Sequence, residues 1–191
     1  MVYFLARMLW RIFLTVVGRW KIQGKGNLPA VGGVIIASNH CSYLDPIIVG
    51  CSFDRKVSYL AKEELFSNPL IAWFIRQMGA FPVKRGSGDR GAIRESIRLL
   101  TTGHAFGIFP EGTRSPDGKL QAGKPGAAML AVKAKVPIVP VGIIGSKQCR
   151  NIRVNIGQPM YFPDLWEEKV SKETLEEITG RIMLEIAQLT E

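Results

Sequence analysis

Histidine and cysteine are scarce in this sequence of 191 residues. The two histidines, His40 and His104, lie far apart, and the three cysteines, Cys41, Cys51 and Cys149, match no metal-ligand spacing. An odd number of scattered cysteines is typical of a reducing, cytoplasm-facing compartment and not of a secreted disulfide framework. We therefore expect reduced cysteines, no metal site and no resident cofactor.

Apolar runs long enough to cross a membrane are absent as well. The N-terminal stretch MVYFLARMLWRIFLTVVGRW carries Arg7 and Arg11, and its longest uncharged piece, residues 12–18, is far shorter than the ~20 residues of a membrane-spanning helix. The stretch also lacks a convincing small-residue cleavage site, so we expect no cleavable signal peptide.

The same N-terminal stretch is amphipathic if it forms a helix. At about 100° per residue, one narrow stripe carries Arg7, Arg11, Thr15 and Gly18, and the remaining surface is largely aromatic or aliphatic. A wide apolar face with a basic stripe favours a helix in the membrane interface, and we assign residues 1–22 to such a membrane-associating segment. The alternative is an amphipathic helix that packs against its own domain.

Acidic residues are outnumbered, because 25 Lys and Arg stand against 16 Asp and Glu, for a net charge of +9. Such a surface attracts anions, which include nucleic acid, anionic lipid and phosphorylated small molecules. No recognised nucleic-acid motif is present, and the cations do not alternate with aromatics as on a base-stacking sheet. We therefore expect lipid or phosphorylated partners and no nucleic acid.

Short apolar runs alternate with helical patterns over most of the chain. Strands are predicted over residues 33–38, 57–61, 80–83, 105–109, 137–144 and 153–157. Helices are predicted over residues 89–103, 125–135 and 171–189. Buried strands that alternate with helices predict an α/β fold, in which a single domain over residues 23–191 has a central mixed sheet covered by helices.

His40 is the first candidate for chemistry. It follows the strand predicted at 33–38, where α/β folds tend to place ligand sites, and Asp45 comes five positions later in ASNHCSYLDP. A turn through Ser42 and the Asp45-Pro46 pair can bring the carboxylate to the imidazole, where it fixes the tautomer and stabilises the charged ring. His40 would then act as a general base near neutral pH. From spacing alone, a structural histidine stays an open alternative.

The loop FPEGTRSPDG (109–118) is the second candidate. It follows a predicted strand and combines an acid, a hydroxyl and a cation in Glu111, Thr113 and Arg114. A guanidinium in this place can hold a phosphate through two parallel hydrogen bonds. The alternative is a surface turn closed by an ion pair between Glu111 and Arg114.

A second basic loop follows the strand predicted at 80–83. Lys84 and Arg85 enter a glycine-rich segment in GAFPVKRGSGDR and offer two cations to an anion, although a solvated basic loop is an equal alternative. The histidine–carboxylate pair and both loops all fall at the ends of predicted strands. Their common position favours one functional site over three coincidences.

These stretches resemble the motif blocks of a known family, the glycerolipid acyltransferases typified by 1-acyl-glycerol-3-phosphate acyltransferase. The His-x-x-x-x-Asp block matches residues 40–45, and Phe-Pro-Glu-Gly-Thr-Arg is unchanged at 109–114. The apolar Val-Pro-Ile-x-Pro-Val block matches 136–141. Gly-x-x-Phe-Ile-x-Arg matches GAFPVKR at 79–85 more loosely, with Pro and Val in the Phe and Ile places. The resemblance covers about residues 24–160.

The resemblance implies transfer of a fatty acyl group from acyl-CoA or acyl-carrier protein, as co-substrate, to the free hydroxyl of 1-acyl-glycerol-3-phosphate. The product would be phosphatidic acid, in phospholipid biosynthesis. His40 would take the proton from the attacking hydroxyl, and Asp45 would hold the imidazolium. No protein nucleophile is needed, so the neighbouring Cys41 is not expected to form an acyl-enzyme. Glycerol 3-phosphate or another lysophospholipid is the alternative acceptor.

By the same resemblance, the substrate-binding residues are Lys62, Lys84, Arg85, Glu111, Gly112, Thr113 and Arg114. Arg85 and Arg114, with Lys84 beside them, are implied for the acceptor phosphate. Glu111 is implied for orienting the acceptor or Arg114. Lys62 is implied for polarising the thioester oxygen.

Acyl-chain substrates support the membrane interpretation of residues 1–22. A second apolar stretch, FSNPLIAWFIRQMG (66–79), either extends that surface or packs in the core. We expect a peripheral or monotopic protein at the cytoplasmic face of the membrane, where basic residues attract anionic lipid and the acyl donor. Two rival classes remain: a nucleic-acid-binding module, and a non-catalytic lipid-binding scaffold that would not depend on His40.

Overall fold

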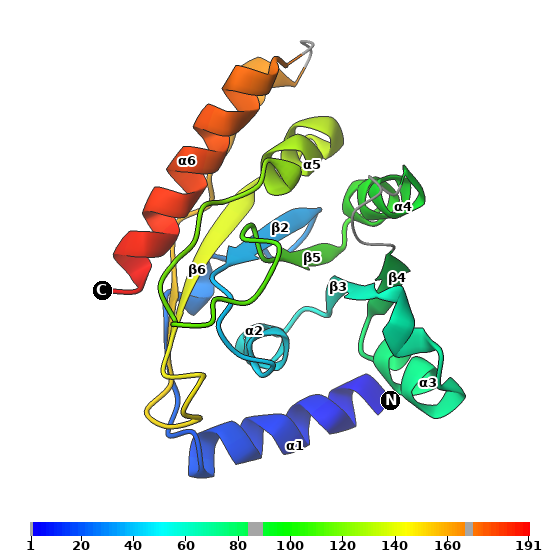
Figure 1. Cartoon of the computed structure of the whole chain (residues 1–191), viewed down its shortest axis with the longest axis vertical. Coiled ribbons are helices and arrows are strands. Elements are labelled where there is room, and N and C mark those ends of the chain that lie inside the picture. Colours follow the sequence, from blue (N-terminus) through cyan, green and yellow to red (C-terminus); the bar gives the residue numbers. More distant parts are fainter. Residues whose placement is uncertain (1, 84–89, 167–169) are drawn as a thin grey trace.

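A mixed sheet of seven strands lies at the centre of the molecule (Figure 1); the computed structural model describes residues 2–83, 90–166 and 170–191. The strands are β1 (Lys21–Gln23), β2 (Val34–Ser38), β3 (Val57–Lys62), β4 (Ala80–Val83), β5 (Ala105–Ile108), β6 (Ile138–Ile144) and β7 (Arg153–Ile156). Their order is β1-β7-β6-β2-β5-β3-β4, and only the pairing of β6 with β7 is antiparallel. The mixed α/β sheet predicted from the sequence is therefore confirmed.

Helices cover both faces of this sheet. They are α1 (Val2–Val16), α2 (Asp45–Ser52), α3 (Pro69–Gln77), α4 (Arg90–Thr101), α5 (Gly126–Ala134) and α6 (Lys172–Leu189). In one core, α4, α5 and α6 pack on side chains that include Ile35 of β2, and in the other, α1 and α2 pack on its neighbour Ile36. Successive strand residues point to opposite faces, so a strand buried on both sides reads as an unbroken apolar run.

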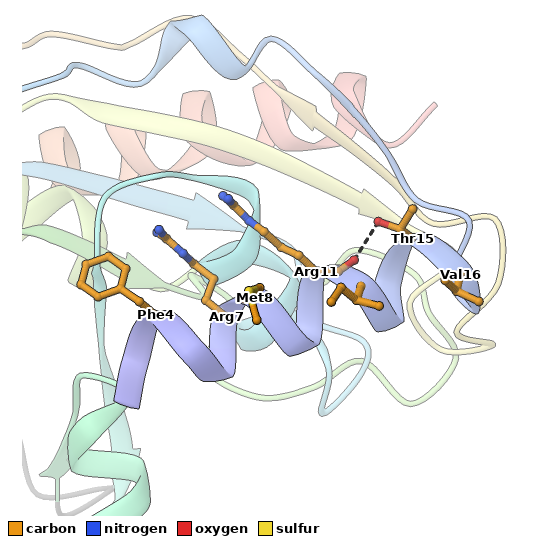
Figure 2. Close-up of a pocket in the computed structure, with 7 residues that line it drawn as sticks. Phe4, Arg7, Met8, Arg11, Thr15 and Val16 are labelled. Carbon is orange, nitrogen blue, oxygen red and sulfur yellow. Dashed lines mark hydrogen bonds between the residues drawn. The ribbon is translucent and has the colours of Figure 1, made fainter. Parts of the chain in front are cut away.

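Helix α1 packs on α2 through its basic stripe. Arg7 Nη1 donates to the carbonyl oxygens of Phe53 and Asp54 at 3.1 and 2.7 Å, and Arg11 Nε donates to the carbonyl oxygen of Cys51 at 2.8 Å. Figure 2 shows both arginines extending from the same side of α1. The two guanidinium groups satisfy carbonyls at the C-terminus of α2, where a helix dipole favours positive charge.

The apolar face of α1 is turned away from the protein. Its exposed side chains are Phe4, Leu5, Met8, Leu9, Ile12, Phe13 and Val16. Only Leu14 of this helix is fully buried. The helix thus packs against its own domain through its basic stripe, and the membrane interpretation of its exposed apolar face stays a prediction.

The second apolar stretch forms α3, beside β4, and contributes to the surface. Leu70, Ile71, Trp73 and Phe74 are all exposed, and no residue of α3 is buried. Within the described ranges, no helix is both long and apolar enough to span a bilayer. The domain division expected after residue 22 falls inside β1, which pairs with β7 as part of the sheet.

Candidate active site

The candidate residues converge at one edge of the sheet. Strands β2, β5 and β6 run parallel, so the loops that follow them meet beyond their C-terminal ends. His40 follows β2, and the loop with Glu111 and Arg114 follows β5. The parallel register thus brings together groups that lie far apart in the sequence.

His40 and Asp45 form a hydrogen-bonded pair. His40 Nδ1 lies 2.9 Å from Asp45 Oδ2, and Asp45 is fully buried in the first turn of α2. The same oxygen accepts the backbone N–H groups of Cys41 and Ser42 at 2.7 and 2.6 Å. Hydrogen bonds to an ionised carboxylate are strong, and a helix N-terminus favours negative charge. These contacts stabilise the buried carboxylate.

The Asp45 contact sets how His40 can act. With Nδ1–H donated to the carboxylate, Nε2 keeps its lone pair and can accept a proton. The imidazole stacks on Phe109, with ring centroids 4.0 Å apart and planes inclined by 20°. Its side chain is 14% exposed, through the wall of the cavity described below. This is the geometry of a general base held in one orientation.

The loop after β5 holds the backbone of His40 on both sides. The N–H of His40 donates to Glu111 Oε1 at 2.7 Å, and the N–H of Ser115 donates to the carbonyl oxygen of His40 at 2.7 Å. The other carboxylate oxygen, Glu111 Oε2, accepts the N–H of Gln121 at 3.0 Å. Glu111 is buried, and its two oxygens link the His40 loop to the connection between β5 and α5. Orientation of the acceptor or of Arg114 by Glu111 stays a prediction.

Arg114 is held by Tyr43. Arg114 Nη2 donates to the Tyr43 hydroxyl at 2.8 Å, and the guanidinium carbon lies 3.5 Å from the centre of the Tyr43 ring. Stacking of this kind orients a guanidinium without neutralising its charge. Glu111 and Arg114 have these other partners, so they do not close the turn as an ion pair.

A cavity of about 1090 Å³ opens beside His40. Gly112, Thr113 and Arg114 line its polar end. Its apolar wall comes from α1, α2, β3, α3 and the 3-10 helix Glu63–Phe66, through side chains that include Trp10, Ile47, Tyr59, Leu65 and Phe74. The cavity therefore offers cations and an imidazole at one end and room for a long apolar chain at the other.

Glycine at position 107 shapes the cavity wall. A Cβ on Gly107 would overlap the ring of Tyr59, which lies on the neighbouring strand β3. The Tyr59 ring therefore packs directly on the backbone of β5, and burial raises the pKa of its hydroxyl well above the ordinary value. Tyr59 thus presents a neutral aromatic surface to the cavity.

The side chains of the other two reactive candidates, Cys41 and His104, do not take part in this arrangement. Burial raises the pKa of the Cys41 thiol, and its Sγ lies 3.5 Å from Ser146 Oγ, so Cys41 is not set up as a thiolate nucleophile. His104 precedes β5, at the opposite edge of the sheet from His40. Its Nδ1 lies 3.0 Å from the hydroxyl oxygen of Thr102.

Sequence reasoning missed Asn39 as a support of the site. Its buried amide pairs with both backbone groups of Ile143 in β6, at 2.9 Å through Nδ2 and at 2.7 Å through Oδ1. Asn39 thereby fixes the start of the loop that carries His40. The only signal in the sequence is a polar residue directly before the histidine, after an apolar strand.

Three of the implied substrate-binding residues are not placed. Lys84 and Arg85 lie outside the described residues. The backbone of Lys62 ends β3 at the active-site edge of the sheet, but its side chain also lies outside the description. Their roles stay predictions.

A buried carboxylate, an oriented imidazole and an apolar cavity at the end of an α/β sheet are typical of an enzyme that uses a general base on a partly apolar substrate. Comparison with known proteins agrees, because residues 19–144 match the family described as Acyltransferase. The chain belongs to this acyltransferase family.

Individual relatives cover nearly the whole chain. The 1-acyl-sn-glycerol-3-phosphate acyltransferase of Bacillus subtilis (strain 168) is 34% identical over 187 residues, 94% of this chain and 92% of that protein. The enzyme of the same name from Streptococcus pneumoniae is 28% identical, and the alignment covers 93% of this chain and 71% of that protein. The crystal structure of the 1-acyl-sn-glycerophosphate (LPA) acyltransferase PlsC from Thermotoga maritima aligns with a TM-score of 0.73 and 27% identity, covering 96% of this chain and 81% of that one.

Replacing Glu111 with Gln tests whether this carboxylate acts through His40. The amide offers one acceptor where two backbone N–H groups need one each, so the His40 loop should shift. We expect kcat to fall roughly ten- to hundredfold with little change in the KM for either substrate. Glu95→Gln on the exposed face of α4 is the matched control. A rise in the acceptor KM alone would show instead that Glu111 contacts the substrate.

Proposed function

We propose that this protein transfers a fatty acyl group from acyl-CoA or acyl-carrier protein to the free hydroxyl of 1-acyl-glycerol-3-phosphate, forming phosphatidic acid. The observation that carries the proposal is His40, fixed by Asp45 at 2.9 Å in the wall of a cavity with a cationic end and an apolar wall. The names of the relatives support this acceptor. Glycerol 3-phosphate or another lysophospholipid is the alternative.

The reaction needs one proton carrier and no protein nucleophile. His40 Nε2 takes the proton from the acceptor hydroxyl while that oxygen attacks the thioester carbonyl carbon. The imidazolium that forms is stabilised by the Asp45 carboxylate. As the carbon–sulfur bond breaks, the sulfur leaves with the electron pair and can receive the proton from His40. The products are the ester and a free thiol.

The two ends of the cavity suit the two parts of the substrates. Apolar side chains from α1, α2 and α3 line the cavity and can enclose an acyl chain. Burial of each methylene of that chain would stabilise the complex by about 0.8 kcal/mol. Arg114, oriented by Tyr43, is available for the acceptor phosphate. By resemblance, Arg85 and Lys84 belong to the same phosphate site, and Lys62 to the thioester oxygen. The net charge of +9 suits both CoA and acyl-carrier protein as donors.

Turnover by the purified protein tests the proposal directly. With lysophosphatidate and acyl-CoA, and then acyl-carrier protein, we expect phosphatidate and free thiol in equal amounts. His40→Ala should lower the rates of phosphatidate formation and of thiol release at least about a hundredfold, because general-base catalysis contributes a rate factor of roughly 10²–10⁴. His104→Ala is the matched control, since His104 lies at the other edge of the sheet.

Other outcomes of this assay point to other functions. Thiol release without phosphatidate would indicate a different acceptor or a thioesterase. No turnover with any donor across a panel of lysolipids and glycerol 3-phosphate would favour a lipid-binding scaffold. Salt-sensitive binding of oligonucleotides that is indifferent to His40 would favour a nucleic-acid module.

We further propose that the protein works at the cytoplasmic face of a membrane as a peripheral or monotopic enzyme. The exposed apolar faces of α1 and α3 support this, and both helices also line the cavity beside His40. Acyl chains could pass from a bilayer to the cavity without crossing water. Apolar side chains on a helix surface favour burial at the boundary between headgroups and acyl chains.

Vesicle binding tests the α1 surface. The triple substitution of Leu5, Leu9 and Ile12 by Ser should lower partitioning to phosphatidylcholine–phosphatidylglycerol vesicles at least about a hundredfold, because each buried aliphatic side chain contributes roughly 1.5–3 kcal/mol. All three side chains are more than half exposed, so the thermal midpoint should stay unchanged. Leu184→Ser, 60% exposed on α6, is the control. Unchanged co-sedimentation of the triple variant would contradict the proposal.

A further inference from the structure

Lys124 belongs to the active-site cavity although it lies outside every motif block of the family resemblance. It precedes α5, and its backbone N–H donates to the carbonyl oxygen of Pro110 at 2.8 Å. This bond folds the segment back onto the loop after β5. Lys124 lines the same cavity as His40 and Arg114.

Gly112 makes room for the Lys124 side chain. A Cβ built on Gly112 would lie 3.1 Å from both Nζ and Cδ of Lys124, so the ammonium group lies against the backbone of this loop. The φ of Gly112 is +73°, in the left-handed region that favours glycine. Glycine is thus favoured here by the backbone conformation, and a Cβ would also crowd the end of the Lys124 side chain.

The charge of Lys124 has no carboxylate partner among the residues that the structure describes. Glu111, the acid nearest in the loop, uses both carboxylate oxygens for backbone N–H groups. Arg114, two residues after Gly112, is held by the neutral Tyr43. Three cations line this cavity, and one of them, Arg7, is bound to backbone carbonyls after α2. Arg114 and Lys124 have no carboxylate partner among the described residues, which is the arrangement that a bound dianion would complete.

We propose that Lys124 and Arg114 together bind the phosphate of the acceptor, with Tyr43 as the positioning residue for Arg114. This inference rests on the proposed function and names a second cation of its phosphate site. Lys124 supplies a compact charge, and Arg114 supplies a planar pair of donors. A phosphate monoester, which carries up to two negative charges, suits this pair better than the single charge of a phosphodiester.

The position of the two cations favours the acceptor over the donor as the source of the phosphate. In a lysophosphatidate, only a few covalent bonds separate the phosphate from the hydroxyl that His40 must deprotonate. In an acyl thioester, the whole pantetheine arm separates the nearest phosphate from the reacting carbonyl. Both cations lie in the connection between β5 and α5, which also binds the backbone of His40, and they are therefore placed for the acceptor phosphate.

Lys124→Met tests this assignment, with Lys119→Met as the control, because Lys119 is an exposed lysine of the same loop region that does not line the cavity. We expect Lys124→Met to raise the KM for lysophosphatidate roughly ten- to hundredfold, as for the loss of one charge-assisted hydrogen bond. The KM of Lys124→Met for the acyl donor should stay within about twofold of the wild-type value. For Lys119→Met, the KM values for lysophosphatidate and for the acyl donor should both stay within about twofold of wild type. The turnover of 1-acylglycerol, which lacks the phosphate, should not change.

Three results of this experiment would overturn the inference. A rise in the donor KM alone would assign Lys124 to the donor phosphates. An equal loss with lysophosphatidate and 1-acylglycerol would show a general structural effect. An equal effect of Lys119→Met would show only the loss of surface charge.

A second measurement does not depend on turnover. Reductive methylation of the wild-type protein, followed by mass spectrometry, should show Lys124 protected by short-chain lysophosphatidate and Lys119 unprotected. Neither 1-acylglycerol nor free coenzyme A should protect Lys124. Protection without phosphatidate formation would support the cation pair while contradicting the proposed reaction. Phosphatidate formation without protection would overturn the cation pair alone.

Discussion

The hydrogen bonds to Asp45 Oδ2 are the constraint on which the rest of the site depends. One oxygen of a fully buried carboxylate receives His40 Nδ1 and two backbone N–H groups, whereas Oδ1 has no partner among the described residues. An uncompensated charge at this depth would cost several kcal/mol, so the loop must keep its conformation for the fold as well as for catalysis. At the other end of α2, Arg7 and Arg11 bind the last carbonyls, so α1 braces the helix that presents Asp45.

The positive charge of the chain serves several separate purposes. Arg7 and Arg11 are structural, and Arg55 donates to the carbonyl oxygens of Pro29, Gly32 and Gly103, where it joins three loops far from the catalytic edge. Arg114 and Lys124 line the cavity without binding a helix terminus, and Arg7 lines it as well. The net charge of +9 does not distinguish these roles, because composition alone counts a cation that binds backbone carbonyls in the same way as one that can bind an anion.

Much of the fold could be predicted from the sequence because its central strands, β2, β5 and β6, are buried on both faces. β2, β3, β4, β5, β6 and β7 all lie within one or two residues of their predicted bounds. β1 was missed, since a strand of three residues, two of them exposed, gives no periodic signal. The motifs located His40 and Asp45, but Asn39 and Glu111 act through backbone groups that residue types do not reveal. The basic stripe on α1 was recognised from the sequence. That it faces the protein and not solvent depends on the carbonyls at the C-terminus of α2, which is distant in sequence.

The most direct test of this account is the kcat of Asp45→Asn beside that of His40→Ala, with thermal midpoint and vesicle binding measured on the same preparations. An asparagine can place its carbonyl oxygen where Asp45 Oδ2 accepts, but it carries no negative charge and cannot stabilise an imidazolium. The account predicts that Asp45→Asn loses activity by about a thousandfold or more, nearly as much as His40→Ala. A folded Asp45→Asn variant that keeps more than about a tenth of the wild-type kcat would contradict it.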